Sequence, residues 1–274
     1  MSDDRYKDFR QAVGRAETEI NLGRAALAIA ASDYPKLDID TYLSRIGELA
    51  ASAAARLGGD ADVYRSIASV NTVLFHEQGF RGNREQYFDP RNSFLNEVLD
   101  RKTGIPISLS VLYMEVGQKI GLALQGIGFP GHFLVKALGD GEEIIIDPFN
   151  QGEILSHESL GAMLSKLYGG KIVFDPVLLQ PLSKKQILRR MLNNLKLIYL
   201  RDEDWMKGLS VVERLVVLDP ESGEDVRDRG LIYLRLECFK QALEDLESYL
   251  RLMPHATDAD VVRERVKVLT RQIH

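Results

Sequence analysis

A lone histidine and a lone aspartate follow one apolar helix pattern in a fixed order, and together they could do proton chemistry. The helix pattern runs from Gly104 to Gly121, His132 comes next, and Asp147 ends an apolar strand pattern. An imidazole can take a proton from a nucleophile while a carboxylate holds its productive tautomer. The matching nucleophile is a thiol at the helix start, where the macrodipole lowers its pKa. Here Pro106 occupies that start, so the thiol is missing from the frame of a thiol enzyme.

Two serines near the helix start are the alternative nucleophiles. Ser110 lies one helical turn after Pro106, about 6 Å further along the same face, whereas Ser108 is rotated by roughly 200°. Both serines could instead be ordinary helix residues, one of them bonding a free N–H near the helix start. Proline suits the first helical turn because its missing N–H costs nothing there. A hydrolase or acyl transferase that uses Ser108 or Ser110 with His132 and Asp147 therefore remains the alternative to a site without catalysis.

Two strand patterns joined by a turn would bring the histidine and the aspartate together. Leu122–Phe129 and His132–Leu138 alternate as strands do, and Glu143–Asp147 is the returning strand. Gly139-Asp140-Gly141 between them predicts a hairpin turn. The histidine is thus expected at the start of one strand and the aspartate at the end of the next.

Helix patterns surround these strands. We expect a helix over 8–32, which is rich in alanine, and another over 40–57, where apolar residues recur at helical spacing. Ser93–Leu99 is expected to form a short helix before Gly104. Ser156 is the expected N-cap of a helix that ends at Tyr168.

The C-terminal third contains an internal repeat. Leu197 to Arg201 recurs as Leu231 to Arg235, a shift of 34 residues (231 − 197 = 34). Further pairs at this shift are Trp205 with Phe239, Gly208 with Ala242, and Pro220 with Pro254. A period of 34 with a small residue, an aromatic residue and a closing proline is the tetratricopeptide signature, in which each unit is two antiparallel helices.

Four segments resemble the SirB1-like family of the transglutaminase-like superfamily. They are Tyr87–Leu99, Arg101–Ser110, Pro130–Phe133 and Ile146–Asn150, within a likeness that extends from about Tyr34 to Pro254. Active transglutaminase-like enzymes begin the helix with Gly-x-Cys and end it on Leu-Gly after the same span as Pro106 to Gly121. By this resemblance Pro106 stands at the cysteine position, and His132 and Asp147 match the catalytic histidine and aspartate.

The resemblance implies an α+β fold with a transglutaminase-like, papain-like core of a helix and a small antiparallel sheet. We expect an N-terminal helical region over 1–80 and the core over 81–182. An α-helical tetratricopeptide pair, about 187–220 and 221–254, and a capping helix would fill 183–274. Because the cysteine position holds proline, the resemblance implies a pseudoenzyme, a scaffold or adaptor that binds a peptide or protein through the old site, the repeats or both.

Polar residues near the expected site could contact a ligand. The candidates are Arg91, Asn92, Asn96 and Asn150. In the resembling family the block around Asn92 is a signature, and its place in the chain suggests that it lines the same site. Loop capping by asparagine and serine side chains is the competing interpretation.

The composition excludes several classes of function. The net charge is −5 and no basic stretch is present, so we expect no nucleic-acid binding. Cys238 is the one cysteine, which excludes an internal disulfide. The histidines show no metal-ligand spacing: His76, His132, His157, His255 and His274. No apolar run approaches the roughly 18 residues of a membrane span, so we expect a cytoplasmic protein. We also expect it to hold no metal or cofactor and to have a protein or peptide as its partner.

Overall fold

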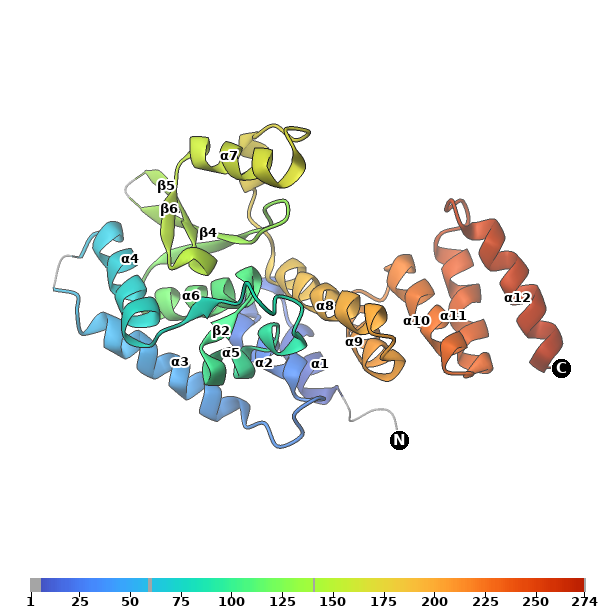
Figure 1. Cartoon of the computed structure of the whole chain (residues 1–274). Coiled ribbons are helices and arrows are strands. Elements are labelled where there is room, and N and C mark those ends of the chain that lie inside the picture. Colours follow the sequence, from blue (N-terminus) through green and yellow to red (C-terminus); the bar gives the residue numbers. More distant parts are fainter. Residues whose placement is uncertain (1–5, 59–60, 140, 274) are drawn as a thin grey trace. The chain divides into compact units, whose positions relative to one another are not determined.

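A helix that is buried along most of its length lies at the centre of the larger of the chain's two compact units. The computed structural model describes residues 6–58, 61–139 and 141–273, and the larger unit spans 14–191. Helix α6 (Pro106–Lys119) is buried at every position from Pro106 to Gly117. A helix that is covered on all sides belongs in the middle of a core, and α6 lies below the sheet in Figure 1.

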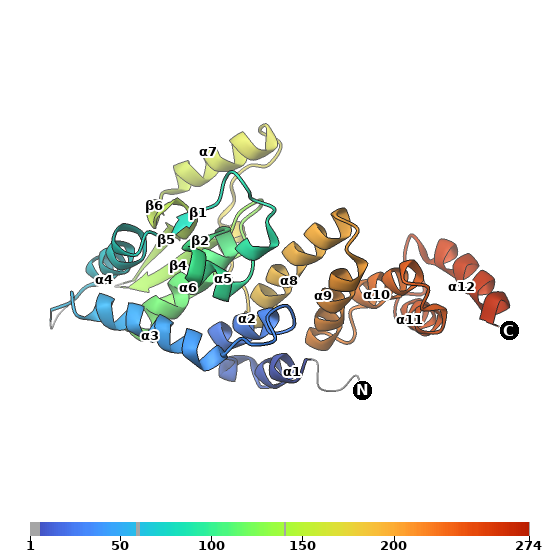
Figure 2. The ribbon, with the colours of Figure 1, turned by 60° about the horizontal axis from the view of Figure 1, so that its bottom comes forward.

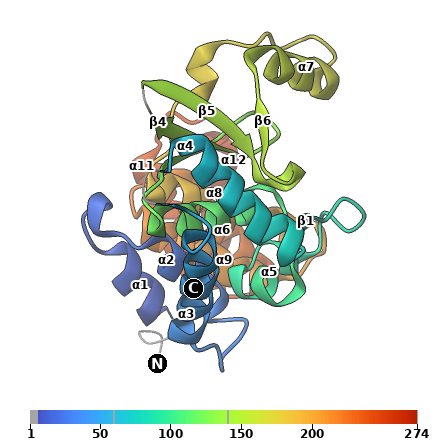
Figure 3. The same ribbon diagram turned by 90° about the vertical axis from the view of Figure 1, so that its left-hand side faces the viewer.

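A four-stranded antiparallel sheet covers one side of α6. Its strands, in spatial order, are β3 (Ala123–Ile127), β4 (Leu134–Gly139), β5 (Glu142–Asp147) and β6 (Glu153–Leu155). On the other face of the sheet, Leu134 and Ile145 pack with Leu160 and Leu164 of α7 (His157–Tyr168). Figure 3 shows the strands between α7 above and α6 below. This arrangement confirms the expected α+β class.

Several helices precede α6, and three of them begin at the polar N-cap residues Asn21, Asp38 and Asp62. In the described residues they are α1 (Lys7–Val13), α2 (Leu22–Ala30), α3 (Ile39–Ala54), α4 (Val63–Asn71) and α5 (Leu95–Arg101). Asn21 accepts the N–H of Arg24 at 2.8 Å and so starts α2 as a new helix. The expectation of one helix over 8–32 is therefore wrong.

Two short strands connect the segment after α4 to the start of α6. Helix α4 continues as a π-helical stretch, Thr72–Glu77. Strand β1 (Arg81–Gly82) then pairs in parallel with β2 (Thr103–Gly104). Because β2 directly precedes α6, this pairing holds the loop after β1 beside the helix start.

His132 lies in a turn before β4 and not on the strand itself. Its N–H donates to the C=O of Phe129 at 3.0 Å, and Gly131 has a φ of +67°. The expected strand His132–Leu138 is wrong at its start because this turn delays the strand to Leu134. Asp140 of the expected hairpin turn lies outside the described residues, although β4 and β5 pair as expected.

In its described residues, 6–13 and 192–273, the second unit consists of helices joined by turns. Helix α8 (Lys184–Arg201) enters it, followed by α9 (Trp205–Leu218), α10 (Gly223–Arg235), α11 (Phe239–Leu252) and α12 (Ala259–Ile273). Helices α9 and α11 start 34 residues apart (239 − 205 = 34), and each ends just before its proline (Figure 2). The structure thus confirms the period of the repeat.

Apolar packing and a partly buried ion pair join the repeat helices. Leu246 of α11 packs with Val262 and Leu269 of α12. Arg229 of α10 binds both carboxylate oxygens of Asp245 on α11 at 2.7 Å. Such a bidentate pair fixes the register of two helices as well as adding energy.

Candidate functional site

The start of α6 is complete without a nucleophile. Pro106 is buried at the first helical position, directly after the N-cap residue Ile105. The position suits proline because an N–H there would have no partner within the helix. Ser108 Oγ accepts the N–H of Ile105 at 3.1 Å and donates to the C=O of Asn92 at 2.6 Å. The helix start therefore needs no thiol for its stability.

His132 and Asp147 form a hydrogen-bonded pair. Nε2 of His132 lies 2.9 Å from Oδ2 of Asp147, and the aspartate side chain is fully buried, whereas that of His132 is 12% exposed. An ionised carboxylate accepts the Nε2 proton and so leaves Nδ1 as an acceptor. A ring with one nitrogen bonded to a carboxylate and the other able to accept a proton is the tautomer that a catalytic base requires.

Asp147 also holds the turn that follows β5. Its Oδ1 accepts the N–H groups of Phe149 at 3.1 Å and Asn150 at 3.3 Å. Its Oδ2, shared with His132, accepts the Asn150 amide at 2.6 Å. The capped turn, Pro148–Asn150, packs against α6. The carboxylate therefore has a structural task that does not depend on catalysis.

Aromatic rings and an arginine surround this turn. The rings of Phe149 and His132 meet edge to face with centroids 5.8 Å apart, and Tyr87 meets Phe149 at 6.4 Å. The guanidinium of Arg84 lies over the Phe149 ring, 5.1 Å from its centroid, and donates to the side-chain amide oxygen of Asn150. A Cβ at Gly82 would lie 2.5 Å from the Phe149 ring, so only glycine permits this approach.

Arg190, near the start of α8, fixes the turn that carries His132. Its Nη2 donates to the C=O of His132 at 2.6 Å and to that of Phe129 at 3.0 Å. Burial lowers the pKa of this half-buried guanidinium, while Tyr87 and Tyr168 raise it. Arginine stays protonated in proteins, so Arg190 places a positive charge beside the histidine.

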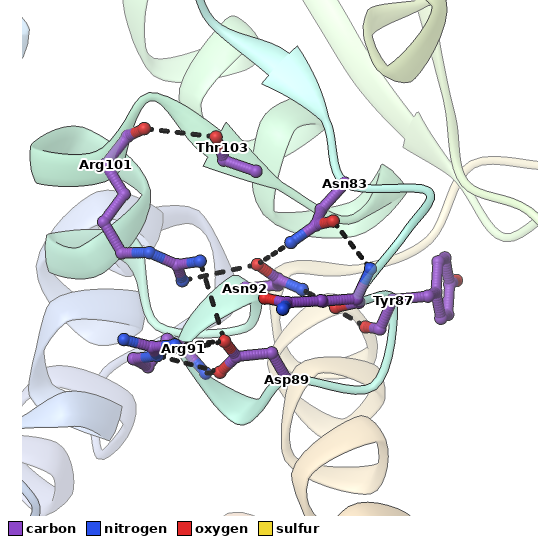
Figure 4. A network of polar contacts seen from close by, with 8 residues as sticks. Asn83, Tyr87, Asp89, Arg91, Asn92, Arg101 and Thr103 are labelled. Carbon is purple, nitrogen blue, oxygen red and sulfur yellow. Dashed lines mark hydrogen bonds and ion pairs between the residues drawn. The ribbon is translucent and has the colours of Figure 1, made fainter.

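Asn92 is the centre of a polar network that holds the loop before α5, as Figure 4 shows. Its Nδ2 donates to the C=O groups of Gln86 at 2.7 Å and Tyr87 at 3.3 Å. Its Oδ1 accepts from Asn83 at 3.2 Å and Arg101 at 3.4 Å. Because both donors and both lone pairs of the amide are engaged within the protein, Asn92 positions the loop that carries Tyr87.

Arg91 is exposed and is bound to its neighbour Asp89. Its Nε lies 3.0 Å from both carboxylate oxygens, and Nη2 lies 2.7 Å from one of them (Figure 4). This contact holds the pKa of Asp89 below its usual value. The charge of Arg91 also acts on Tyr34 and Glu97, away from the residues bonded to His132.

The four polar residues expected to bind a ligand thus have different surroundings. Asn150 bonds to the carboxylate of the His132–Asp147 pair. Asn92 is saturated by the loop network, and Arg91 is engaged by Asp89. Asn96 of α5 is buried and is one of the residues that line a separate pocket.

Neither serine of α6 is hydrogen-bonded to His132. Ser108 uses its hydroxyl to complete the helix start. Ser110 is fully buried, and its Oγ has no hydrogen-bond partner. A serine nucleophile needs its base within hydrogen-bond reach, and neither hydroxyl has this contact in the structure.

Three residues around His132 were missed by the sequence analysis: Arg84, Tyr87 and Arg190. Tyr87 opens one of the quoted motifs, which could have drawn attention to it. Arg84 stands in a loop and Arg190 in a helix pattern, and no local spacing distinguishes either of them. Their role follows from contacts between segments far apart in the chain.

The repeat unit has an apolar pocket of its own, with a volume of about 520 Å³. Leu234 of α10 and Phe239 of α11 form one wall, and Val261 and Val268 of α12 form another. The two valines are 59% and 54% exposed. Exposed apolar side chains that line a concave surface are typical of a binding site for an apolar partner.

Across 6–58, 61–139 and 141–273, no three side chains of His, Cys, Asp or Glu group as a metal site would require. Within those ranges no helix combines the length and the apolar character that crossing a membrane demands.

Comparison with known proteins relates both units to described families. The model of the transglutaminase-like superfamily matches residues 40–193, and a tetratricopeptide-repeat model matches 195–267. A UPF0162 protein of Xylella fastidiosa (strain Temecula1) is 38% identical over 245 residues, which cover 88% of this chain and 87% of that protein. A UPF0162 protein of Vibrio cholerae is 32% identical over 252 residues, covering 92% and 93%.

A relative with a name of its own is the protein SirB1 of Salmonella typhimurium. It is 26% identical over 247 residues, which cover 88% of this chain and 90% of that protein. The chain therefore belongs to the SirB1-like family of the transglutaminase-like superfamily, with a transglutaminase-like core followed by tetratricopeptide repeats.

Proposed function

We propose that this protein is a pseudoenzyme, a scaffold or adaptor that holds a peptide or protein partner. The observation that carries the proposal is Pro106 at the first position of α6, where the resembling enzymes have cysteine. Proline has no group that could attack a carbonyl carbon. The covalent route of a thiol enzyme is therefore closed at its first step.

The contacts of the His132–Asp147 pair support a role other than catalysis. The carboxylate of Asp147 caps a turn, and the backbone of His132 is bound by Arg190. A pair with these structural tasks stabilises the fold even when no nucleophile is present. Nδ1 of His132 remains an acceptor that a bound ligand could use.

The apolar pocket of the repeat unit supports the binding half of the proposal. Tetratricopeptide repeats are protein-interaction modules, and stacked helix pairs create concave binding surfaces. The pocket that Phe239, Val261 and Val268 line fits a peptide with apolar side chains spaced to enter it.

The first experiment restores the missing thiol. Pro106→Cys is made in a Cys238→Ser background, so that the new cysteine is the only one. We expect iodoacetamide to alkylate it with a thiol pKa below the usual 8.5 or so, because the helix start and His132 both favour the thiolate. Adding His132→Ala should raise that pKa and slow alkylation at pH 7. Equal alkylation profiles with and without His132 would contradict the assignment of Pro106 to the cysteine position.

The second experiment tests for catalysis in the protein as it stands. Wild type and His132→Ala are compared for hydrolysis of activated acyl esters and amides. We expect neither to exceed the rate in buffer. Turnover by wild type that His132→Ala abolishes would overturn the proposal and direct attention back to Ser108 and Ser110.

The third experiment tests binding at the repeats. Peptides are selected from a random library on the full chain, and the selected peptides are titrated against Val268→Asp. A charge in the pocket wall should weaken the binding of an apolar peptide by at least tenfold, because the bound peptide would remove water from that charge. Val173→Asp is the matched control, since Val173 is 82% exposed and lies outside this pocket. Equal affinities for both variants would contradict peptide binding in this pocket.

A further inference from the structure

Helix α12 carries an open row of side chains at the end of the repeat unit (Figure 1). Val261 and Val268 of this row are 59% and 54% exposed. Glu264 and Arg265 lie between them in the chain and are exposed as well. All four residues line the apolar pocket of the repeat unit. In residues 6–58, 61–139 and 141–273 no helix follows α12 to cover this row.

The repeat period shows what such a row does in the preceding repeat. The same positions of α10, 34 residues earlier, include Arg227, Gly230 and Leu234. All three face α11. The guanidinium of Arg227 lies 5.6 Å from the centroid of the Tyr249 ring. A Cβ at Gly230 would lie 3.1 Å from Leu246, and Leu234 packs against the same apolar cluster. The row on α12 is therefore the face on which a repeat array packs its next antiparallel helix.

The row is complementary to itself. Val261 precedes Glu264 by three residues, and Val268 follows Arg265 by three residues. Reversing the direction of the helix thus exchanges the two valines with each other and the glutamate with the arginine. A two-fold interface requires a surface of this kind, in which one patch meets a second copy of itself. A second α12, laid antiparallel on the first, places valine against valine and opposite charges against each other.

The two central charges are free to pair with a second copy. Arg265 has no ion-pair or hydrogen-bond partner in the described ranges. Glu264 binds Lys267 at 2.6 Å, and these two side chains are 71% and 63% exposed. An exposed pair of this kind contributes little to stability. Glu264 can therefore accept an arginine of a second copy at little cost, and a carboxylate with an arginine forms the stronger, bidentate contact.

We propose that α12 of one chain packs antiparallel on α12 of a second copy, so that Val261 of each chain contacts Val268 of the other and Glu264 pairs with Arg265. The inference rests on the proposed function, because it names the protein partner of the same pocket. Phe239, at the start of α11, is 39% exposed and supplies further apolar surface. The row covers about two helical turns. Because this face is smaller than those of stable complexes, we expect a micromolar dissociation constant.

The first test measures the dimer by sedimentation equilibrium of the full chain, from low micromolar to several hundred micromolar concentration. We expect a reversible conversion of monomer to dimer across this range. Val268→Asp buries a charge at both valine contacts and should weaken the dimer by at least tenfold. Val173→Asp is the matched control, since Val173 is 82% exposed and lies outside the row. Both valines are exposed in the single chain, so we expect both variants to fold.

The second test determines the orientation by exchanging the central charges. Glu264→Arg and Arg265→Glu each place like charges against each other at two symmetrical contacts. Each variant alone should therefore dimerise at least tenfold more weakly than wild type. A mixture of the two should form a heterodimer at least tenfold tighter than either parent, because every arginine then faces a glutamate. Glu158→Arg, an exposed change of the same charge on α7, is the control and should dimerise as wild type does.

Two results would overturn the proposal. One is a chain that stays monomeric over the whole concentration range. The other is a mixture of Glu264→Arg and Arg265→Glu that associates no more tightly than its parents. The proposed function fails on different measurements, namely turnover that depends on His132 and peptide titrations in which Val268→Asp has no effect. A monomeric chain whose selected peptides still depend on Val268 would contradict the dimer and leave the proposed function in place.

Discussion

The start of α6 and the turn after β5 carry the positions that the resemblance assigns to a transglutaminase-like site, and they differ in what else they do. Position 106 needs only a residue that suits the first helical turn, and Ser108 completes the helix start. Asp147, by contrast, accepts two backbone N–H groups, an amide and an imidazole. The first position can lose its chemical group without cost to the fold, whereas the second cannot.

The difference explains how a histidine–aspartate pair can be retained where the cysteine position holds proline. A thiol at a helix start contributes chemistry alone. Proline at the same position contributes a backbone angle that suits the first helical turn. The carboxylate of Asp147 contributes to the fold whether or not a nucleophile is present, because four donors would be left unsatisfied without it. A retained pair is therefore weak support for catalysis unless the nucleophile accompanies it.

The largest expected effect is that of Asp147→Ala. The change leaves the donors of His132, Phe149 and Asn150 without their acceptor, so we expect a loss of about 4 kcal/mol in the free energy of unfolding. Urea denaturation measures it. Asp62→Ala, which removes the N-cap of α4, should cost about 1 kcal/mol. Equal losses in the two variants would show that Asp147 is not the structural centre of this turn.

Asn92→Ala comes next. Removal of a fully buried amide with four engaged positions should cost about 3 kcal/mol. Arg91→Ala is the adjacent control, and because its side chain is exposed we expect an unfolding free energy close to that of wild type. If both variants unfold at the same urea concentration, the loop network of Figure 4 does not hold the loop.

The two serines of α6 give a smaller, paired prediction. Ser108→Ala leaves the N–H of Ile105 and the C=O of Asn92 unpaired, and we expect a loss of about 2 kcal/mol. Ser110→Ala removes a hydroxyl that has no partner, so its unfolding free energy should lie within about 0.5 kcal/mol of wild type. The same urea curves decide the matter, and a larger loss for Ser110 would mean that its hydroxyl has a partner in solution.

The smallest expected effect depends on pH. Burial raises the pKa of Glu115, which accepts the N–H of Gly23 at 2.9 Å. A raised carboxyl pKa contributes stability below its ordinary value of 4.5, and this contribution is lost as the pH rises through the folded-state value. Glu115→Gln keeps the acceptor and has no charge to bury. The free energy of unfolding of Glu115→Gln, relative to that of wild type, should therefore increase as the pH rises from 4.5 to 8.

Exposed Glu158 supplies the control for that measurement. Glu158→Gln removes one exposed carboxylate and so corrects for the change in net charge that Glu115→Gln also makes. A Glu115→Gln variant whose advantage falls with rising pH would contradict the sign derived from burial.

Local interactions made much of this protein predictable from its sequence. The repeat period places α9 and α11, and Ser156 caps α7 by accepting the N–H of Ser159 at 3.1 Å. Caps, prolines and periodic apolar positions act within one turn of the residue that carries them, so their spacing is visible in the chain. Asn21 carried the same kind of signal, yet the apolar pattern across 8–32 concealed it.

The tertiary structure alone decided what the polar residues of the larger unit do. Asn92 and Asn96 have the same side chain and lie four residues apart, but the amide of Asn92 is saturated, whereas Oδ1 of Asn96 has no hydrogen-bond partner. Arg190 reaches His132 from a helix 58 residues later in the chain. Contacts of this kind depend on which segments the packed core brings together, and no spacing within a single segment encodes them.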